Sequence, residues 1–133
     1  MIDNHFIIDT NFILRYLLAD NKDQYKITSE FFKEVKAGRA KAIIKELVIA
    51  EVVFVLSSNY KVPRDRIAQS LCQLLPYKGI TMEDKEAVIK ALTIYANTNL
   101  HIVDAILASH AQLSKTKLLT FDKKLKKLVD SSA

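Results

Sequence analysis

Two kinds of hydrophobic pattern alternate along this chain. Short apolar runs bounded by polar residues indicate strands, and apolar residues at three- and four-residue spacing indicate helices. The expected strands are 6–8, 42–44, 79–81 and 118–121. The expected helices are 10–19, 23–37, 46–58, a segment between Pro63 and Pro76, a segment from about 82 to 95, 102–114 and a short basic helix after 122. This alternation predicts an α/β fold whose mainly parallel sheet is covered by helices on both faces.

Several residues mark the expected helix ends. Gly38 is placed to cap the end of the second helix, and Pro63 lies in the first turn of the fourth. The sequence 81–84, Thr-Met-Glu-Asp, has the form of a capping box and predicts a helix start there.

Length and composition fit one globular domain over residues 1–133. Half of the residues are hydrophobic and 26% are charged, and the chain holds two glycines and two prolines. The single cysteine, Cys72, lies in an apolar stripe and is expected to be a small core residue. The start of the chain lacks the pattern of an export signal, and no apolar stretch is long enough to span a membrane. A cytoplasmic location is therefore expected.

The net charge of +5 is concentrated near one end of the sequence. Residues 115–127 contain six lysines and one acid, whereas basic and acidic residues are balanced elsewhere. Such a cluster can bind phosphates by releasing counterions, although a lysine-rich helix is often only a solvated surface.

Two aspartates follow apolar runs that are expected to be strands. Asp9 follows 6–8, and Asp122 follows 118–121. If these strands are parallel, both aspartates lie at the edge of the sheet where α/β proteins bind ligands. Each could equally serve as the N-cap of the helix that follows it.

Two further acids interrupt apolar helices. Glu51 lies within 47–56, where every helical face is apolar, so we expect it to be partly buried and to need a cation or hydrogen-bond donors. Asp104 lies in the apolar stretch 100–108, near a helix start where the helix dipole alone could account for an acid. Four acids in such settings suggest one shared site.

Carboxylates gathered together repel one another unless a metal ion takes up their charge. Oxygen ligands favour Mg²⁺ or Mn²⁺. The three histidines have no zinc-like spacing, and His101 is at most a weak outer candidate, one turn before Asp104. The expected metal ligands are Asp9, Glu51, Asp104 and Asp122.

At these residues the chain resembles the PIN-domain proteins, and most of all the VapC-type toxins of toxin–antitoxin pairs. The resemblance rests on Phe-Ile-Ile-Asp-Thr-Asn at 6–11, on Glu51 in its apolar helix, on Val-Asp-Ala at 103–105 and on Leu-Thr-Phe-Asp-Lys at 119–123. Each piece is short, and their order and spacing give the likeness its strength.

The resemblance implies a three-layer α/β/α sandwich and cleavage of RNA phosphodiester bonds that depends on divalent metal ions. It assigns the acidic roles to the four carboxylates and implies that Thr120 supplies a hydroxyl and Asn11 an amide beside the metal. Lys123 and Lys124 then become candidate RNA contacts. The resemblance also implies a homodimer and a small antitoxin whose C-terminal segment covers the cleft.

Other functions stay open at this point. A stand-alone RNA-processing nuclease or a DNA nuclease would use the same acids. A noncatalytic RNA-binding module would explain the lysines but not Glu51. A phosphotransferase of the haloacid-dehalogenase type would need a second aspartate at position 11, which is asparagine. A receiver domain would need an early acidic pair and a strand-terminal lysine, which we do not find.

Overall fold

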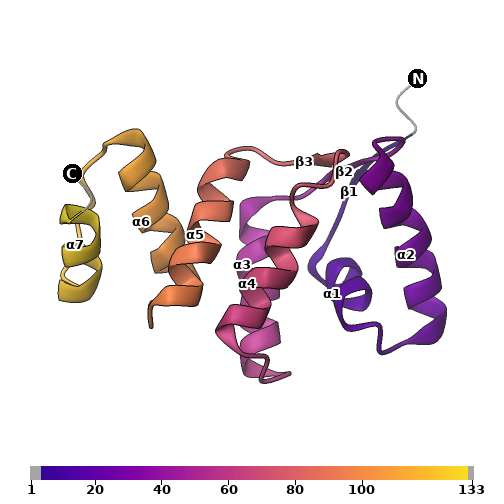
Figure 1. Ribbon diagram of the computed structural model, residues 1–133, viewed down its shortest axis with the longest axis horizontal. Helices are drawn as coiled ribbons and strands as arrows, with labels where there is room; N and C mark the ends of the chain where they lie inside the picture. The colour runs from indigo at the N-terminus through magenta and orange to yellow at the C-terminus, as the bar shows by residue number, and fades with distance from the viewer. Residues whose placement is uncertain (1–3, 132–133) are drawn as a thin grey trace.

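The computed structural model describes residues 4–131 and contains ten helices and strands in that range (Figure 1). In chain order they are β1 His5–Ile7, α1 Thr10–Leu18, α2 Lys22–Ala37, β2 Lys41–Ile43, α3 Glu46–Ser58, α4 Arg64–Leu74, β3 Ile80–Thr81, α5 Lys85–Asn97, α6 Ile102–Ser114 and α7 Lys123–Asp130.

The three strands form one parallel sheet in the order β1-β2-β3. Phe6 is level with Ala42, and Ala42 is level with Ile80. Helices α1 and α2 connect β1 to β2, and α3 and α4 connect β2 to β3, as parallel neighbours require. The expected α/β class with a parallel sheet is confirmed, and β1 lies at an edge of the sheet.

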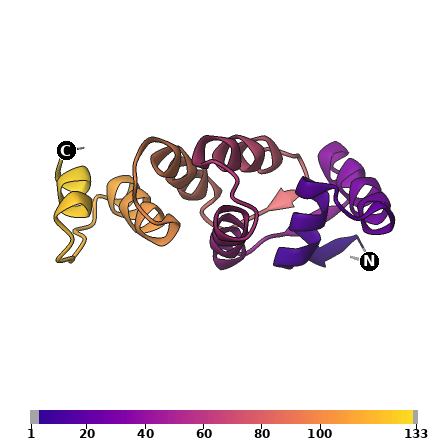
Figure 2. The same cartoon turned by 90° about the horizontal axis from the view of Figure 1, so that it is seen from below.

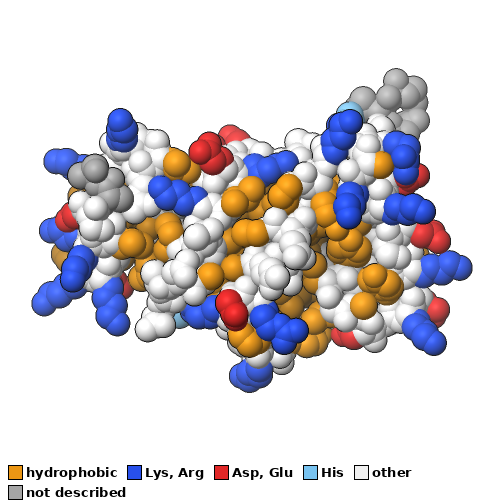
Figure 3. All heavy atoms as spheres, viewed as in Figure 1, with side chains coloured by type: hydrophobic (Ala, Val, Ile, Leu, Met, Phe, Trp, Pro, Cys, Tyr) orange, Lys and Arg blue, Asp and Glu red, His pale blue; other side chains and the backbone are white. Residues whose placement is uncertain are grey.

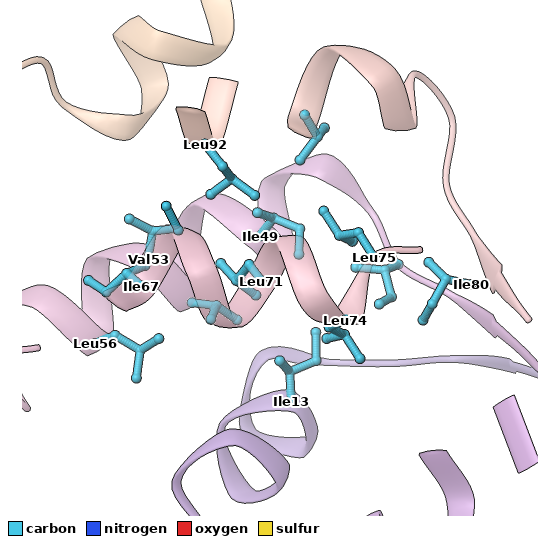
Figure 4. Packing of buried hydrophobic residues seen from close by; sticks show 14 of the residues in the cluster. Ile13, Ile49, Val53, Leu56, Ile67, Leu71, Leu74, Leu75, Ile80 and Leu92 are labelled. Carbon is cyan, nitrogen blue, oxygen red and sulfur yellow. The ribbon is translucent and has the colours of Figure 1, made fainter. Parts of the chain in front are cut away.

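The main core lies between α1, α3, α4 and the sheet (Figure 4). Its largest fully buried side chains include Phe32, Ile13, Ile49 and Leu71. They come from apolar positions at helical spacing, so each helix buries one stripe. This core fixes α1 against α3, the two helices that carry Asp9 and Glu51 near their starts.

The remaining helices extend from this core in a row (Figures 1 and 2). Helix α5 packs on α4, α6 packs on α5, and α7 packs on α6. The buried Ser109 hydroxyl donates a hydrogen bond to the Ala87 carbonyl at 2.6 Å, which ties α6 to α5. His110 Nε2 lies 2.8 Å from Glu46 Oε2, which ties α6 to α3. Helix α7 therefore forms the end of the molecule opposite α1 and α2.

Most expected helix ends agree with the structure. Gly38 ends α2 in the left-handed conformation, with φ of 84° and its N–H bound to carbonyls of the last turn, as expected. Pro63 is the N-cap of α4. The capping box at 81–84 is wrong, because α5 begins at Lys85 after a left-handed Asp84 whose side chain makes no capping hydrogen bond.

Glycine is required at position 79 for a different reason. A Cβ there would lie 2.0 Å from the Ala40 carbonyl oxygen, so no larger residue fits where the chain enters β3.

Two expectations about strands and burial are wrong. Residues 118–121 form no strand. The apolar faces of α3 are not all buried, because Leu47 and Phe54 on this helix are 74% and 65% exposed. Residues 118–121 have no strand of the described chain to pair with, because they lie next to α7, at the end of the molecule away from β1. Within the described range no helix is both long and apolar enough to cross a bilayer.

Candidate active site

Asp9 lies where β1 leads into α1. Its side chain is exposed, and it is the N-cap of α1, with Oδ1 accepting a hydrogen bond from the Phe12 N–H at 2.9 Å. A carboxylate has about four acceptor positions, so this capping bond leaves others for a cation. The capping role considered from the sequence is therefore present, and it is compatible with a metal-binding role.

Glu51 lies in the second turn of α3 and faces the start of α1. Its Oε1 accepts a hydrogen bond from the Thr10 hydroxyl, the residue directly after Asp9. The expectation that Glu51 is partly buried is wrong: it is exposed, on the same uncovered face of α3 as Leu47 and Phe54. No ion pair joins it to a basic side chain in the described part of the chain, so its charge is free to meet a cation.

Asp9 and Glu51 border one open hollow of about 450 Å³. Asn11, in the first turn of α1, lines the same hollow, as its expected place beside the metal requires. The structure thus brings together two of the four acids and the expected amide.

A cationic group also borders this hollow. Arg15 lies one turn after Asn11, forms an ion pair with Asp20 at 2.7 Å and donates a hydrogen bond to the Tyr60 hydroxyl at 3.2 Å. The Tyr60 hydrogen bond is the main reason that the pKa of Arg15 is raised, and Asp20 raises it further. An arginine held beside two carboxylates can meet a phosphate that approaches them.

Arg15, Tyr60 and Thr10 were not among the site residues predicted from the sequence. A usable signal existed for two of them, because Arg15 follows Asn11 by one helical turn and Thr10 adjoins Asp9. Tyr60 lies 45 residues from Arg15, and nothing in the sequence pattern links the two.

Asp104 does not line the hollow with Asp9 and Glu51. It lies half-buried in the first turn of α6, where the positive end of the helix dipole favours an acid. His101 is the N-cap residue of this helix but makes no capping bond with its side chain.

Asp122 lies at the far end of the molecule, at the start of α7 (Figures 1 and 2). It is exposed and caps α7, with Oδ1 accepting from the Leu125 N–H at 3.0 Å. Its own N–H donates to the Thr120 hydroxyl at 3.0 Å. Thr120 therefore lies next to Asp122, but the pair is separated from Asp9, and the expected place of Thr120 beside a metal stays a prediction.

Lys123 and Lys124 are exposed in the first turn of α7. Figure 3 shows lysine side chains projecting from this end of the molecule. They lie beside Asp122, not beside the hollow that Asp9 and Glu51 line.

The donor chemistry of these residues fits a hard divalent cation, since carboxylate and amide oxygens are its usual protein ligands. The structure does not, however, bring all four acids together. Among residues 4–131 no three acidic, histidine or cysteine side chains come close enough together to hold a metal ion. The four-acid cluster thus stays a prediction, of which this conformation contains one half at the start of α1.

Comparison with known proteins identifies the family. A VapC ribonuclease of Aquifex aeolicus (strain VF5) is 24% identical to this chain over 123 residues, which cover 92% of this chain and 90% of that protein. No solved structure matches the chain at a comparable level. The sequence model of the PIN domain family matches residues 6–130, from β1 to the end of α7. The chain belongs to the PIN domain family.

Proposed function

We propose that this PIN-domain nuclease hydrolyses phosphodiester bonds of RNA with the help of Mg²⁺ or Mn²⁺, and that it is the toxin of a VapBC-type pair. The observation that carries the proposal is the shared hollow of Asp9, Glu51 and Asn11 in a PIN-domain chain. The likeness to a VapC ribonuclease over nine-tenths of both chains supports RNA as the substrate.

Each predicted site residue has a role in this proposal, both those that line the hollow and those that lie away from it in this conformation. Asp9 and Glu51 would hold the metal, with Asp104 and Asp122 completing the set, and Asn11 and Thr120 would contribute polar groups beside it. The bound metal would lower the pKa of a water molecule and stabilise charge on the leaving oxygen. Thr10 holds the Glu51 carboxylate toward Asp9 through its hydroxyl.

Positive side chains oppose the repulsion between the acids and the RNA backbone. Arg15 is fixed by Asp20 and Tyr60 at the border of the hollow, where it can pair with a phosphate. Lys123 and Lys124 would contact the backbone farther along the strand.

The proposed partners follow from the VapC likeness. A small antitoxin would cover the site, the nuclease would act as a homodimer, and both would work in the cytoplasm. A short reading frame beside the gene, encoding a DNA-binding antitoxin that suppresses the toxicity of this chain on co-expression, would support the pairing. If the chain is not toxic and no such reading frame exists, a solitary RNA-processing nuclease is the better description.

The enzymatic proposal is tested by incubating purified protein with RNA and with DNA of the same sequence. We expect RNA cleavage with Mg²⁺ or Mn²⁺ and none with EDTA. Asp9→Asn and Glu51→Gln should each lower the rate by about 100-fold or more, because each removes a charge that stabilises the transition state. Asp9→Asn keeps an oxygen that can cap α1, so the fold should persist.

Glu30→Gln is the matched control, since Glu30 is an exposed acid on α2 away from the hollow. Its activity should equal that of the wild type. Cleavage that persists in EDTA, or in a well-folded Asp9→Asn/Glu51→Gln double variant, would contradict the proposed mechanism.

A further inference from the structure

The segment Leu118–Phe121 exposes apolar side chains that a folded protein usually covers. Leu119 is 93% exposed and Phe121 is 105% exposed, the two highest values among the large hydrophobic residues of the described chain. The segment has the composition of a strand but makes no strand pairing. It is therefore a strand-forming sequence without a neighbouring strand.

The outer edge of β1 lacks a partner strand in the described residues. No strand lies beside this edge in residues 4–131, so β1 presents unpaired backbone groups there. Phe6 and Ile7 on this strand are 42% and 73% exposed. The Phe6 ring packs edge-on against Phe31 with centroids 5.4 Å apart, and Phe31 packs in the same way on Phe12. An aromatic group thus extends to the open edge of the sheet.

The two segments match in their local structure. Each is an apolar run that ends in an aspartate, and each aspartate caps the helix that follows. Pairing them in parallel with Asp122 level with Asp9 puts Leu119 level with Phe6 and Phe121 level with Ile8. Level residues of parallel strands share a face. Leu119 and Phe121 would then extend the aromatic face, while Thr120 would lie beside Ile7.

The chain's own packing holds this segment away from its own β1. Helix α7 is fixed on α6 by Leu125, which is buried with Leu100 and Ala108, and by a hydrogen bond from Gln112 to the Leu128 carbonyl at 3.3 Å. Helix α6 is in turn fixed on α5 and α3 by the hydrogen bonds described above. As Figures 1 and 2 show, α7 and β1 are at opposite ends of the molecule.

We propose that Leu118–Asp122 of a second copy of this chain pairs with the open edge of β1, and that the two copies exchange this segment reciprocally. A reciprocal exchange has two-fold symmetry and leaves neither segment exposed. It also brings the partner's Asp122 and the partner's Thr120 beside Asp9. On the proposed function, each active site then combines Asp9 and Glu51 of one chain with Asp122 of the other.

Oligomeric state is the first test. Light scattering should give the wild type twice the 15.1 kDa mass of one chain. Leu119→Asp/Phe121→Asp should be monomeric with an unchanged circular dichroism spectrum, because both side chains are exposed in the single chain. Ile27→Asp, which changes an exposed apolar residue of α2, should remain dimeric. A monomeric wild type would overturn the proposal, even if a different protein proves to cover these residues. A double variant that stays dimeric would overturn it as well.

Cross-linking separates exchange between chains from closure within one chain. In a Cys72→Ala background, one chain carries Phe6→Cys and a differently tagged chain carries Leu119→Cys. Co-expression and mild oxidation should give a covalent dimer that contains both tags. If only a chain carrying both cysteines cross-links, and it does so internally, the segment folds back on its own β1 and the exchange is refuted.

Complementation then tests the shared site. Asp9→Asn and Asp122→Asn chains, each inactive alone, should regain roughly a quarter of wild-type activity when co-expressed, because half of the dimers are mixed and each has one intact site. No recovery beside a confirmed intermolecular cross-link would remove Asp122 from the shared site. An inactive wild type would contradict the proposed function and would leave the mass and cross-linking results to decide the exchange.

Discussion

At the scale of the single residue, Asp9 and Asp122 each combine a structural role in a helix cap with a proposed role in metal binding. Each caps a helix with one carboxylate oxygen, at 2.9 and 3.0 Å from the backbone nitrogen, and each is proposed to hold a metal ion. The sequence left these two interpretations as alternatives, but the geometry makes them compatible. Substitutions at these positions therefore affect folding and activity through different atoms.

Alanine and asparagine should separate these effects at position 9. Asp9→Ala removes the α1 cap and should lower the free energy of unfolding by about 1 kcal/mol, whereas Asp9→Asn should lower it by only a few tenths. Both should abolish RNA cleavage. Urea denaturation of the two variants measures the difference, and equal stability of the two would show that the cap contributes nothing.

Tyr16 gives a pH prediction. Its hydroxyl lies 2.8 Å from that of Tyr77, and burial, followed by this hydrogen bond, raises the pKa of Tyr16 above its usual value. The folded state therefore keeps this proton more firmly than the unfolded state. The resulting stabilisation is complete below pH 10 and is lost as the pH rises further.

Denaturation between pH 8 and about pH 11 should show this loss in the wild type and a smaller one in Tyr16→Phe. Tyr25→Phe removes only the smallest of the contributions that raise the pKa of Tyr16, so this variant should keep most of the wild-type loss. Identical alkaline losses in Tyr16→Phe and the wild type would refute the assignment.

At the scale of the element, hydrophobic spacing predicted the helices well because each helix buries its own stripe. The boundaries of α3 and α6 agree with the expected ones. The strand at 118–121 was predicted wrongly for a physical reason: a strand also needs an edge to pair with, and α7 is fixed to α6 instead. The local sequence pattern indicates that the segment containing Phe121 can form a strand, but it does not indicate which strand it would pair with.

The same limit applies to the candidate site. Apolar context pointed to Asp9 and Glu51, and the packing of α1 on α3 places both at one hollow. It misjudged the burial of Glu51, because burial depends on which distant segment covers α3. The position of Asp104 and Asp122 relative to Asp9 is likewise a property of chain packing and not of the local sequence.

The end of α1 offers a prediction about helix termination. Ala19 adopts the left-handed conformation with φ of 51° and is exposed. Glycine adopts this conformation without the steric cost of a Cβ, so Ala19→Gly should raise the free energy of unfolding by about 1 kcal/mol. Ala37→Gly, at an exposed helical position of α2, should lower it. Thermal unfolding compares the two, and a destabilised Ala19→Gly would contradict the assigned conformation.

At the scale of the whole molecule, the basic helix and the acidic hollow lie toward opposite ends of the long axis. The basic helix α7 stands at one end and the hollow with Asp9 and Glu51 lies near the other. In a single chain, a bound RNA strand would have to span this distance. Exchange of the C-terminal segment would instead place the lysines of one chain beside the acids of the other.

Salt dependence of RNA binding measures the contribution of these lysines. Lys123→Gln/Lys124→Gln should reduce the slope of log affinity against log salt by about 1.4, since each contact with single-stranded RNA contributes about 0.7. Lys22→Gln/Lys26→Gln, on exposed positions of α2, is the control. Binding should be measured without divalent ions to prevent cleavage. Equal slopes for both variants would exclude α7 from the RNA contact.

The contact between Thr10 and Glu51 also bears on the time course of folding. This contact joins two helices of one chain, whereas the proposed meeting of Asp9 with the partner's Asp122 needs two chains to associate. Packing within a chain does not depend on protein concentration, but association of subunits is slower at low concentration. On the proposed function, the protein would acquire its helices and sheet first and its nuclease activity last. Refolding followed in parallel by circular dichroism and by RNA cleavage would then show a lag between structure and activity, and the lag would shorten as protein concentration rises.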